Sequence, residues 1–386
     1  MIRLILLTDF TEAFAHNLLR GILEYSKGRE PWVVCRMPPS YKQRYGIVGV
    51  LKWAKKWGAN AIVAQFNDDD DVQLFAKNGI VAVAQDFKSR FDIIPNITSE
   101  YKLTGQMAAD FFIRKGFKHF AFYGYKDVVW SEERCEGFYD EIARLGFGEN
   151  FYEYQRQRLE DLWFYESTPL VDWLKSLPYP TALLACDDNQ GNKITEVCNF
   201  CGIKIPEEIS VLGVDNDETI CNLSDPSLSS VNLNIGKGGY EAARLIENLI
   251  QNKNITYEDV VIHPTGIVNR LSTNIYSTDD PYILAALKYI HQNLATKMSV
   301  SDIVRQVPLS RRLLEVRFKQ ATKESVYQYI FNLRMERFSQ YLLENNDPIS
   351  EIAMRVGLID YKNLARQFKI LKKYSPSEYR KRHMVK

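Results

Sequence analysis

Short apolar runs alternate with amphipathic stretches through the first 270 residues of the chain. The runs have the length of buried strands, and the stretches between them repeat apolar residues at intervals of three and four, which predicts helices. Regular strand–helix alternation favours a parallel sheet covered by helices on both faces. We expect strands at residues 4–7, 61–64, 81–84, 119–123, 182–185 and 210–213, and helices at 15–27, 103–115, 133–145, 170–177, 191–201 and 239–251.

The same pattern divides the chain into domains. Residues 1–270 are many for one such sheet, so we expect two lobes built from discontinuous segments, with crossings near 100–115, 230 and 255. Residues 271–281 are polar and without periodicity, which is typical of an interdomain linker. Residues 282–386 carry only helical patterns, so we expect an all-α domain after the α/β part.

The helical end contains one motif twice. Residues 300–319 and 349–369 each read as a short helix, a tight turn and a longer helix. Apolar side chains at i and i+4 of each longer helix lie on one face and are expected to pack inward. This duplication predicts two helix-turn-helix units. The matched apolar positions are Ile303 and Ile352, Val307 and Val356, Leu314 and Leu364, and Phe318 and Phe368.

The polar face of each longer helix is a candidate DNA-reading surface. Arg and Lys pair with guanine edges, whereas Tyr and Lys also contact phosphates. A long amphipathic helix over residues 326–344 would hold two such readers about 34 Å apart, one duplex turn. Packed helices with solvated basic faces are the alternative, which the matched repeat disfavours. The expected DNA-contacting residues are Ser310, also an N-cap, with Arg311, Arg312, Glu315 and Lys319, and then Tyr361, Lys362, Arg366 and Lys369.

Charge separates the two parts of the chain. Residues 281–386 contain 20 Lys and Arg against 9 Asp and Glu, whereas the preceding residues contain 29 against 39. The overall formal charge of +1 therefore hides a basic end of +11 and an acidic body of −10. A basic module favours a polyanionic partner for the helical end alone.

The composition excludes several classes of protein. Apolar residues make up 46% and charged residues 25%, as in a globular protein with a sizeable core. No apolar run approaches the roughly 20 residues of a membrane helix. The six cysteines are scattered, which favours the cytoplasm. The five histidines lack metal-ligand spacing and no catalytic constellation appears, so we expect no metal, no cofactor and no enzyme.

Polar residues follow several of the predicted strands. Open parallel sheets bind ligands beyond the carboxyl ends of their strands, so these residues predict an effector cleft. Carboxylates accept hydrogen bonds from sugar hydroxyls, Arg donates them, and aromatic rings stack on the C–H face of a sugar. A helix N-cap is the alternative role of each carboxylate. The expected effector contacts are Asp9, Phe10, Asp86, Trp130, Arg134, Asp187, Asp215 and Asn216.

The helical end resembles the AraC/XylS family of transcription regulators over residues 282–383. The resemblance is carried by residues 349–358 and by the run from Phe368 to Arg380, which contains Tyr374-Ser-Pro-Ser-Glu-Tyr379. Pro308 departs from the Gly or small residue usual in the first turn. The run 359–361 departs from the aromatic and small polar residues usual in the second. The resemblance implies a DNA-binding regulator with two helix-turn-helix motifs.

Residues 1–270 resemble the effector domain of LacI/GalR-type regulators, itself similar to periplasmic sugar-binding proteins. Matching segments are residues 116–124, 133–138, 180–188 and 205–217. The resemblance implies that Arg134, Asp187 and Asp215 contact a sugar. The family usually has Asn at the position of Asp187, so the direction of hydrogen bonding there differs.

The order of the two modules resembles the family of xylose operon regulators. Asp127, Trp130, Arg134 and residues 213–216 are placed as in that family. The resemblance implies a transcription activator that responds to D-xylose. It also implies a homodimer that binds an operator with repeated half-sites and contacts RNA polymerase, with no membrane as a partner. Other readings are a regulator for another pentose or hexose, a sugar-acting enzyme using carboxylates such as Asp187 and Asp188, or a passive sugar-binding scaffold.

Overall fold

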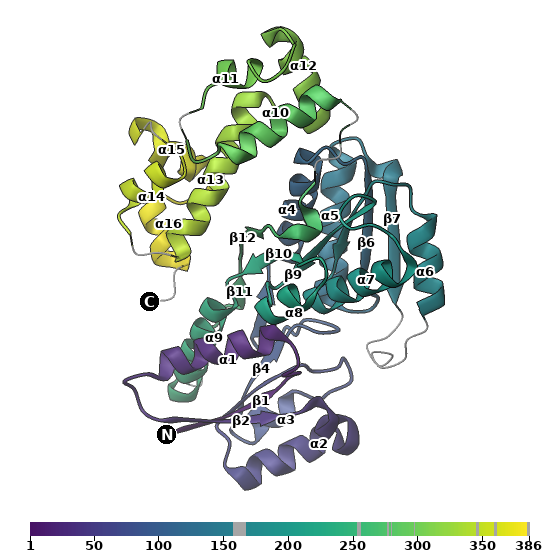
Figure 1. Ribbon diagram of the computed structural model, residues 1–386. Helices are drawn as coiled ribbons and strands as arrows, with labels where there is room; N and C mark the ends of the chain where they lie inside the picture. Colours follow the sequence, from purple (N-terminus) through teal and green to yellow (C-terminus); the bar gives the residue numbers. More distant parts are fainter. Residues whose placement is uncertain are drawn as a thin grey trace.

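Two α/β lobes precede a helical domain in the computed structural model (Figure 1). It describes residues 1–156, 167–252, 256–275, 278, 280–296, 298–344, 347–358 and 361–383. The predicted fold class, two sheets with covering helices followed by an all-α part, is confirmed. Residues 276, 277 and 279 of the predicted linker lie outside the described residues.

Lobe 1 is built on a sheet in the order β11-β5-β4-β3-β1-β2, in which every pair is parallel. Its central strands β1, β3 and β4 are almost continuously buried and aliphatic, as a sheet covered on both faces requires. The strands are β1 (Ile2–Leu7), β2 (Trp32–Met37), β3 (Ala61–Ala64), β4 (Val81–Gln85), β5 (Asn96–Ser99) and β11 (Val260–Ile262), with helices α1 (Ala13–Ser26), α2 (Pro39–Trp57), α3 (Gln73–Lys77) and α9 (Ile235–Gln251).

Lobe 2 repeats the plan in the order β12-β10-β9-β8-β6-β7. One pair, β10 with β12, is antiparallel, which differs from the purely parallel prediction. The strands are β6 (His119–Tyr125), β7 (Phe151–Arg156), β8 (Thr181–Ala185), β9 (Ile209–Val214), β10 (Ser229–Leu233) and β12 (Pro264–Val268), and the helices are α4 (Tyr101–Arg114), α5 (Val129–Arg144), α6 (Ser167–Ser176), α7 (Asp188–Cys201) and α8 (Glu218–Leu223), with short 3-10 turns η1 (Gly148–Asn150) and η3 (Leu271–Thr273).

The chain passes between the lobes at Glu100, Asn234 and His263, so each lobe is discontinuous in sequence. The backbone amide of Glu100 donates to the carbonyl of Ile262 at 3.0 Å. The backbone amide of Asn234 donates to the carbonyl of His263, also at 3.0 Å. The three crossings therefore form one hinge seam. Strand β10 leaves lobe 2 at this seam and β12 enters it there, which explains why these two strands run antiparallel.

All six strands expected from the sequence are present, but β2, β5, β7, β10, β11 and β12 were missed. Strands β5 and β10 are polar, and their side chains are satisfied by distant partners. The backbone and side-chain amides of Asn96 donate to Asp259, and the hydroxyl of Ser229 lies 2.7 Å from that of Thr273. The six predicted helices begin two to four residues earlier than expected, and α2, α3 and α8 are not among them.

The helical domain contains α10 (Pro281–Gln292), α11 (Val300–Val304), α12 (Arg311–Thr322), α13 (Val326–Glu344), α14 (Ile349–Arg355), α15 (Tyr361–Lys372) and α16 (Pro376–His383). Asp280 caps α10 by accepting from the amides of Tyr282 and Ile283, with Pro281 in the first turn, where its missing N–H costs nothing. Figure 1 shows this domain beside lobe 2, on the side of α4 and β12.

Candidate functional sites

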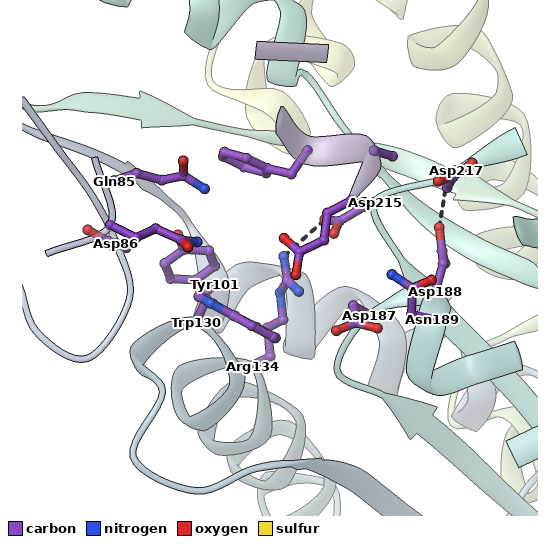
Figure 2. Close-up of a pocket in the computed structure, with 14 residues that line it drawn as sticks. Gln85, Asp86, Tyr101, Trp130, Arg134, Asp187, Asp188, Asn189, Asp215 and Asp217 are labelled. Atoms are coloured by element: carbon purple, nitrogen blue, oxygen red, sulfur yellow. Dashed lines mark hydrogen bonds and ion pairs between the residues drawn. The ribbon is translucent and has the colours of Figure 1, made fainter. Parts of the chain in front are cut away.

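A cleft lies between the two lobes, with an empty volume of about 550 Å³ that includes space open to solvent. Lobe 1 contributes the start of α1 and the ends of β3 and β4, and lobe 2 contributes α4, α5 and the ends of β8 and β9 (Figure 2). The lining residues are Glu12, Ala13, Phe14, Gln65, Gln85, Asp86, Tyr101, Trp130, Arg134, Asp187, Asp188, Asn189, Asp215 and Asp217.

Arg134 is the central cation of this cleft and is only 3% exposed. Its Nη1 donates to the carbonyl of Cys186, and its Nη2 lies 3.2 Å from Oδ1 of Asp215. The guanidinium carbon also lies 5.4 Å from the ring centres of Tyr101 and Trp130. Two aromatic faces and one carboxylate thus hold the guanidinium in a fixed plane for a ligand.

The backbone is strained where Asp215 enters the cleft. Asp215 and the next residue, Asn216, have backbone φ angles of 101° and 54°. Residues other than Gly rarely adopt such positive values. Strain of this kind is retained when the surroundings fix it and is typical of ligand sites. The amide of Asn216 donates to the hydroxyl of Ser230 at 2.9 Å, which helps to hold the turn.

Several polar atoms that face the cleft have no hydrogen-bond partner within the described part of the chain. They are Oε1 of Gln85, Oδ1 of Asp86, Oδ1 of Asp188 and Nε of Arg134, from side chains that are all buried. Leaving buried polar atoms unpaired costs about 1–3 kcal/mol each. Three acceptors and one donor among the side chains that line the cleft are therefore left unpaired within the described part of the chain.

The acids of the cleft bind protons more tightly than acids in water. The pKa of Glu12 is raised from 4.5 to about 8, because burial and the nearby Asp187 raise it by more than Arg134 lowers it. Burial also raises the pKa of Asp86 and of Asp187 to about 6 in each case. The cleft contains more carboxyl groups than cations, so it favours a ligand that donates hydrogen bonds over an anion.

The cleft brings together five of the eight residues expected to contact an effector: Asp86, Trp130, Arg134, Asp187 and Asp215. Asp187 lines the cleft and also has the alternative role considered for it, because its Oδ1 caps α7 by accepting from the amide of Gln190 at 2.7 Å.

The other three expected residues do not line the cleft. Asp9 accepts from the amide and hydroxyl of Thr11, and Phe10 lies 5.4 Å from the guanidinium of Arg36. Asn216 accepts from Nη2 of Arg270 at 2.8 Å, which fixes its side-chain oxygen away from the cleft.

Several lining residues are not among the effector contacts expected from the sequence, and Glu12, Gln85 and Tyr101 are three of them. Gln85 is the last residue of β4, so the strand-end rule that selected Asp86 applies to it as well. Tyr101 opens α4 directly after a lobe crossing. Glu12 follows a turn, and its direction is set by that turn, so no local pattern selects it.

The helical domain contains the repeated unit as predicted. In the first unit Leu314 and Phe318 are buried, and the ring of Phe318 packs edge-on against Tyr329 at 5.2 Å and 85°. In the second unit Phe368 packs against Tyr379 at 5.3 Å and 80°. Helix α13 joins the units without a break. Two helix-turn-helix units with the same internal packing therefore stand on one continuous helix.

The residues expected to read DNA differ in their exposure and in the hydrogen bonds that they already make. Arg311, Arg312 and Lys319 on α12 are exposed, as are Arg366 and Lys369 on α15.

Ser310 caps α12, because its hydroxyl accepts from the amide of Leu313 at 3.3 Å. Glu315 accepts from the amide of Val326 at 3.2 Å, so it supports the start of α13. Tyr361 and Lys362 begin α15, and their side chains lie outside the described residues.

Helix α4 connects the cleft with the helical domain. Its first residue, Tyr101, lines the cleft, and its last residue, Arg114, forms ion pairs with Glu324 (Nε–Oε2, 3.7 Å) and with Glu336 on α13. The next residue, Lys115, donates to the carbonyl of Thr273 at 2.7 Å. Helix α13 also packs on β12, and α12 packs on α4.

Two further features bear on the kind of protein. Among the described residues, no group of three or more His, Cys, Asp or Glu side chains is arranged to hold a metal ion. Of the helices described, none combines the length and the apolar character needed to cross a membrane.

Comparison with family models matches both parts of the chain. Residues 109–273 match a periplasmic binding protein-like domain, and residues 303–382 match a helix-turn-helix domain.

Similar proteins extend over nearly the whole chain. A xylose operon regulatory protein of Haemophilus influenzae is 29% identical over 83% of this chain and 84% of its own length. A xylose operon regulatory protein of Escherichia coli K12 is 27% identical over 98% of this chain and 96% of its own length. A solved structure of the xylose-binding transcription activator xylR is 25% identical, with a TM-score of 0.59 over 99% of this chain and 98% of that one.

Proposed function

Since this chain is an AraC-type transcription regulator joined to a periplasmic-binding-protein-like sugar sensor, we propose that its effector is D-xylose and that it activates sugar catabolism genes. The chain is a regulator and not an enzyme, so the cleft binds sugar without converting it. The choice of D-xylose is supported by the names of the near full-length relatives.

One observation carries the proposal: buried donors and acceptors without partners converge in a cleft with aromatic walls. A pentose presents hydroxyl groups that can donate to Asp86 and Gln85 and accept from Arg134, while Trp130 covers a C–H face. The site is thereby matched to a neutral polyol, because buried polar groups that a ligand leaves unpaired oppose its binding.

The response to sugar depends on coupling between two sites. Sugar that contacts both lobes binds better to a closed cleft than to an open one, and this difference in affinity drives closure. We infer that α4 transmits closure, because its first residue lines the cleft and its last residue is ion-paired with α13. Closure would then reposition the two helix-turn-helix units.

We further propose that the sensor is residues 1–270, the linker 271–281 and the DNA-binding domain 282–386, and that the protein acts in the cytoplasm. A homodimer on an operator with repeated half-sites fits a reader with two units per chain. Contact with RNA polymerase follows if the protein is an activator.

Calorimetric titration of the purified protein with D-xylose, L-arabinose, D-ribose and D-glucose tests the effector. We expect saturable binding of D-xylose, weaker binding of the others, and no chemical change in the recovered sugar. Preferred binding of another sugar would replace D-xylose and leave the regulator intact. A second titration with DNA, with and without the preferred sugar, measures the coupling.

A further inference from the structure

The two recognition helices present different chemistry to DNA. On α12, the face opposite the buried Leu314 and Phe318 carries Leu313 and Val316, which are 40% and 49% exposed. These positions lie in the first two turns, the part of a recognition helix that approaches base edges. Large apolar side chains are therefore in the position where base contacts are made.

No acidic side chain competes with this apolar pair on the same face. Glu315 lies between Leu313 and Val316 in the sequence. Its side chain is directed toward the start of α13, where it accepts a hydrogen bond from the amide of Val326. The exposed cations Arg311, Arg312 and Lys319 surround the pair. A basic frame around an apolar centre suits a polyanion with an apolar group at its contact surface.

The second helix has polar residues at the same positions. Leu364 and Phe368 are buried on α15 as Leu314 and Phe318 are on α12, so the two helices are in the same register. Fifty residues after Leu313 and Val316 come Asn363 and Arg366, both exposed. The equivalent surface is therefore one of hydrogen-bond donors and acceptors.

We propose that α12 reads thymine methyl groups through Leu313 and Val316, whereas α15 reads purine edges through Asn363 and Arg366. In the major groove only thymine presents a methyl group, Asn pairs with adenine, and Arg pairs with guanine. This assignment rests on the proposed function and gives each helix a different base preference. Thymine in one half-site and adenine or guanine in the other are the expected targets.

Selection of duplexes from a random-sequence pool by the purified protein, with its preferred sugar, identifies the operator. Each thymine is then replaced by uracil, which removes only the methyl group and keeps base pairing. In one half-site we expect about fourfold weaker binding for each contacted methyl, the value of one buried CH₂. In Val316→Ala the loss on uracil substitution should shrink at the thymine that Val316 contacts, because that methyl has already lost its partner, and should persist at the thymine that Leu313 contacts.

Arg366→Ala is the matched variant, since it changes the equivalent position on α15. It should lose the purine preference of the other half-site and keep its sensitivity to uracil. Sequence-specific binding that is insensitive to every uracil would overturn the base assignment alone. Unchanged DNA binding by Val316→Ala with loss of transcription activation would assign the pair to a protein partner and also overturn it. Selection of no sequence at all would contradict the proposed function itself.

Discussion

The cleft and the recognition helices use charge in opposite ways. In the cleft, carboxyl groups surround a single guanidinium that is almost completely buried. On α12 and α15 the charged side chains that the structure shows as exposed are all cations. Buried groups interact strongly and lose much when one partner is removed, whereas exposed groups are screened by salt and act mainly through their number.

This difference indicates how each site discriminates. The cleft rejects a wrong ligand because a buried polar group would remain unpaired. The helices bind any DNA through phosphate contacts and gain specificity from the few side chains that reach base edges. Substitutions should therefore have large effects on sugar binding and moderate effects on DNA binding.

Asp215→Ala should produce the largest effect. It removes the carboxylate partner of Arg134 and leaves the guanidinium buried and less well paired. Loss of one partner from a buried pair costs about 2–5 kcal/mol, so calorimetry should find sugar affinity about 30-fold or more weaker. DNA affinity without sugar should persist. Asp172→Ala, on an exposed part of α6, is the control, and loss of basal DNA binding by Asp215→Ala would contradict the separation of roles.

Arg366→Ala should weaken operator binding by about 5- to 150-fold, the range for losing a good bidentate contact to a base. Its sugar affinity should not change, because the side chain is exposed on α15. Fluorescence anisotropy with labelled operator and calorimetry with sugar measure the two quantities. Arg244→Ala in lobe 1 removes an equally exposed cation and should alter neither. A change in sugar affinity for Arg366→Ala would show that the two sites are not independent.

Arg114→Ala should change neither affinity much and should weaken the link between them. Coupling between allosteric sites is typically about 5- to 150-fold, and this variant loses the ion pairs with Glu324 and Glu336. The ratio of DNA affinities with and without sugar should fall toward one. Lys102→Ala, also on α4, removes an exposed ion pair with Glu136 of α5 and is the matched control. An unchanged ratio for Arg114→Ala would exclude this route of coupling.

Glu12→Gln should have the smallest effect and a defined dependence on pH. The folded protein raises the pKa of Glu12 from 4.5 to about 8, so it binds more protons than the unfolded chain between these values. The contribution of this group to stability is complete below pH 4.5 and is lost as pH rises through 8. The melting temperature of Glu12→Gln should therefore fall less between pH 5 and 8.5 than that of the unchanged protein.

The matched control for this prediction is Glu149→Gln, which removes an exposed carboxyl group. It should follow the unchanged protein across the pH range. A fall in melting temperature for Glu12→Gln as steep as that of the control would contradict a protonated Glu12 in the folded protein. Asp86 and Asp187 remain in Glu12→Gln, and each has a pKa of about 6. The melting temperature of this variant should therefore still fall as pH rises, but less steeply and around a lower pH.

The sequence predicted those parts of the sites that depend on local periodicity. Asp86, Asp187 and Asp215 follow buried strands, and parallel strands bring such residues to one edge. The repeat of Leu314 and Phe318 as Leu364 and Phe368 likewise predicted which side chains of the longer helices are buried in both helix-turn-helix units.

What the sequence could not predict depends on partners that are distant along the chain. Asn216 was expected in the cleft, but two successive left-handed residues turn it toward Arg270, 54 positions away. Glu315 was expected on DNA, but its partner is the amide that opens α13. The ion pairs of Arg114 join residues more than 200 positions apart, and no local pattern marks them.

The length of α4 has a consequence for how this protein can evolve. The 14 residues from Tyr101 to Arg114 span roughly 20 Å, at 1.5 Å per residue. One inserted or deleted residue would rotate one end relative to the other by roughly 100°. Surface loops tolerate such changes, but here Arg114 would turn away from Glu336 while Tyr101 stayed in place. Sugar preference and operator preference are free to diverge by substitution, whereas the number of residues in this helix must be inherited unchanged.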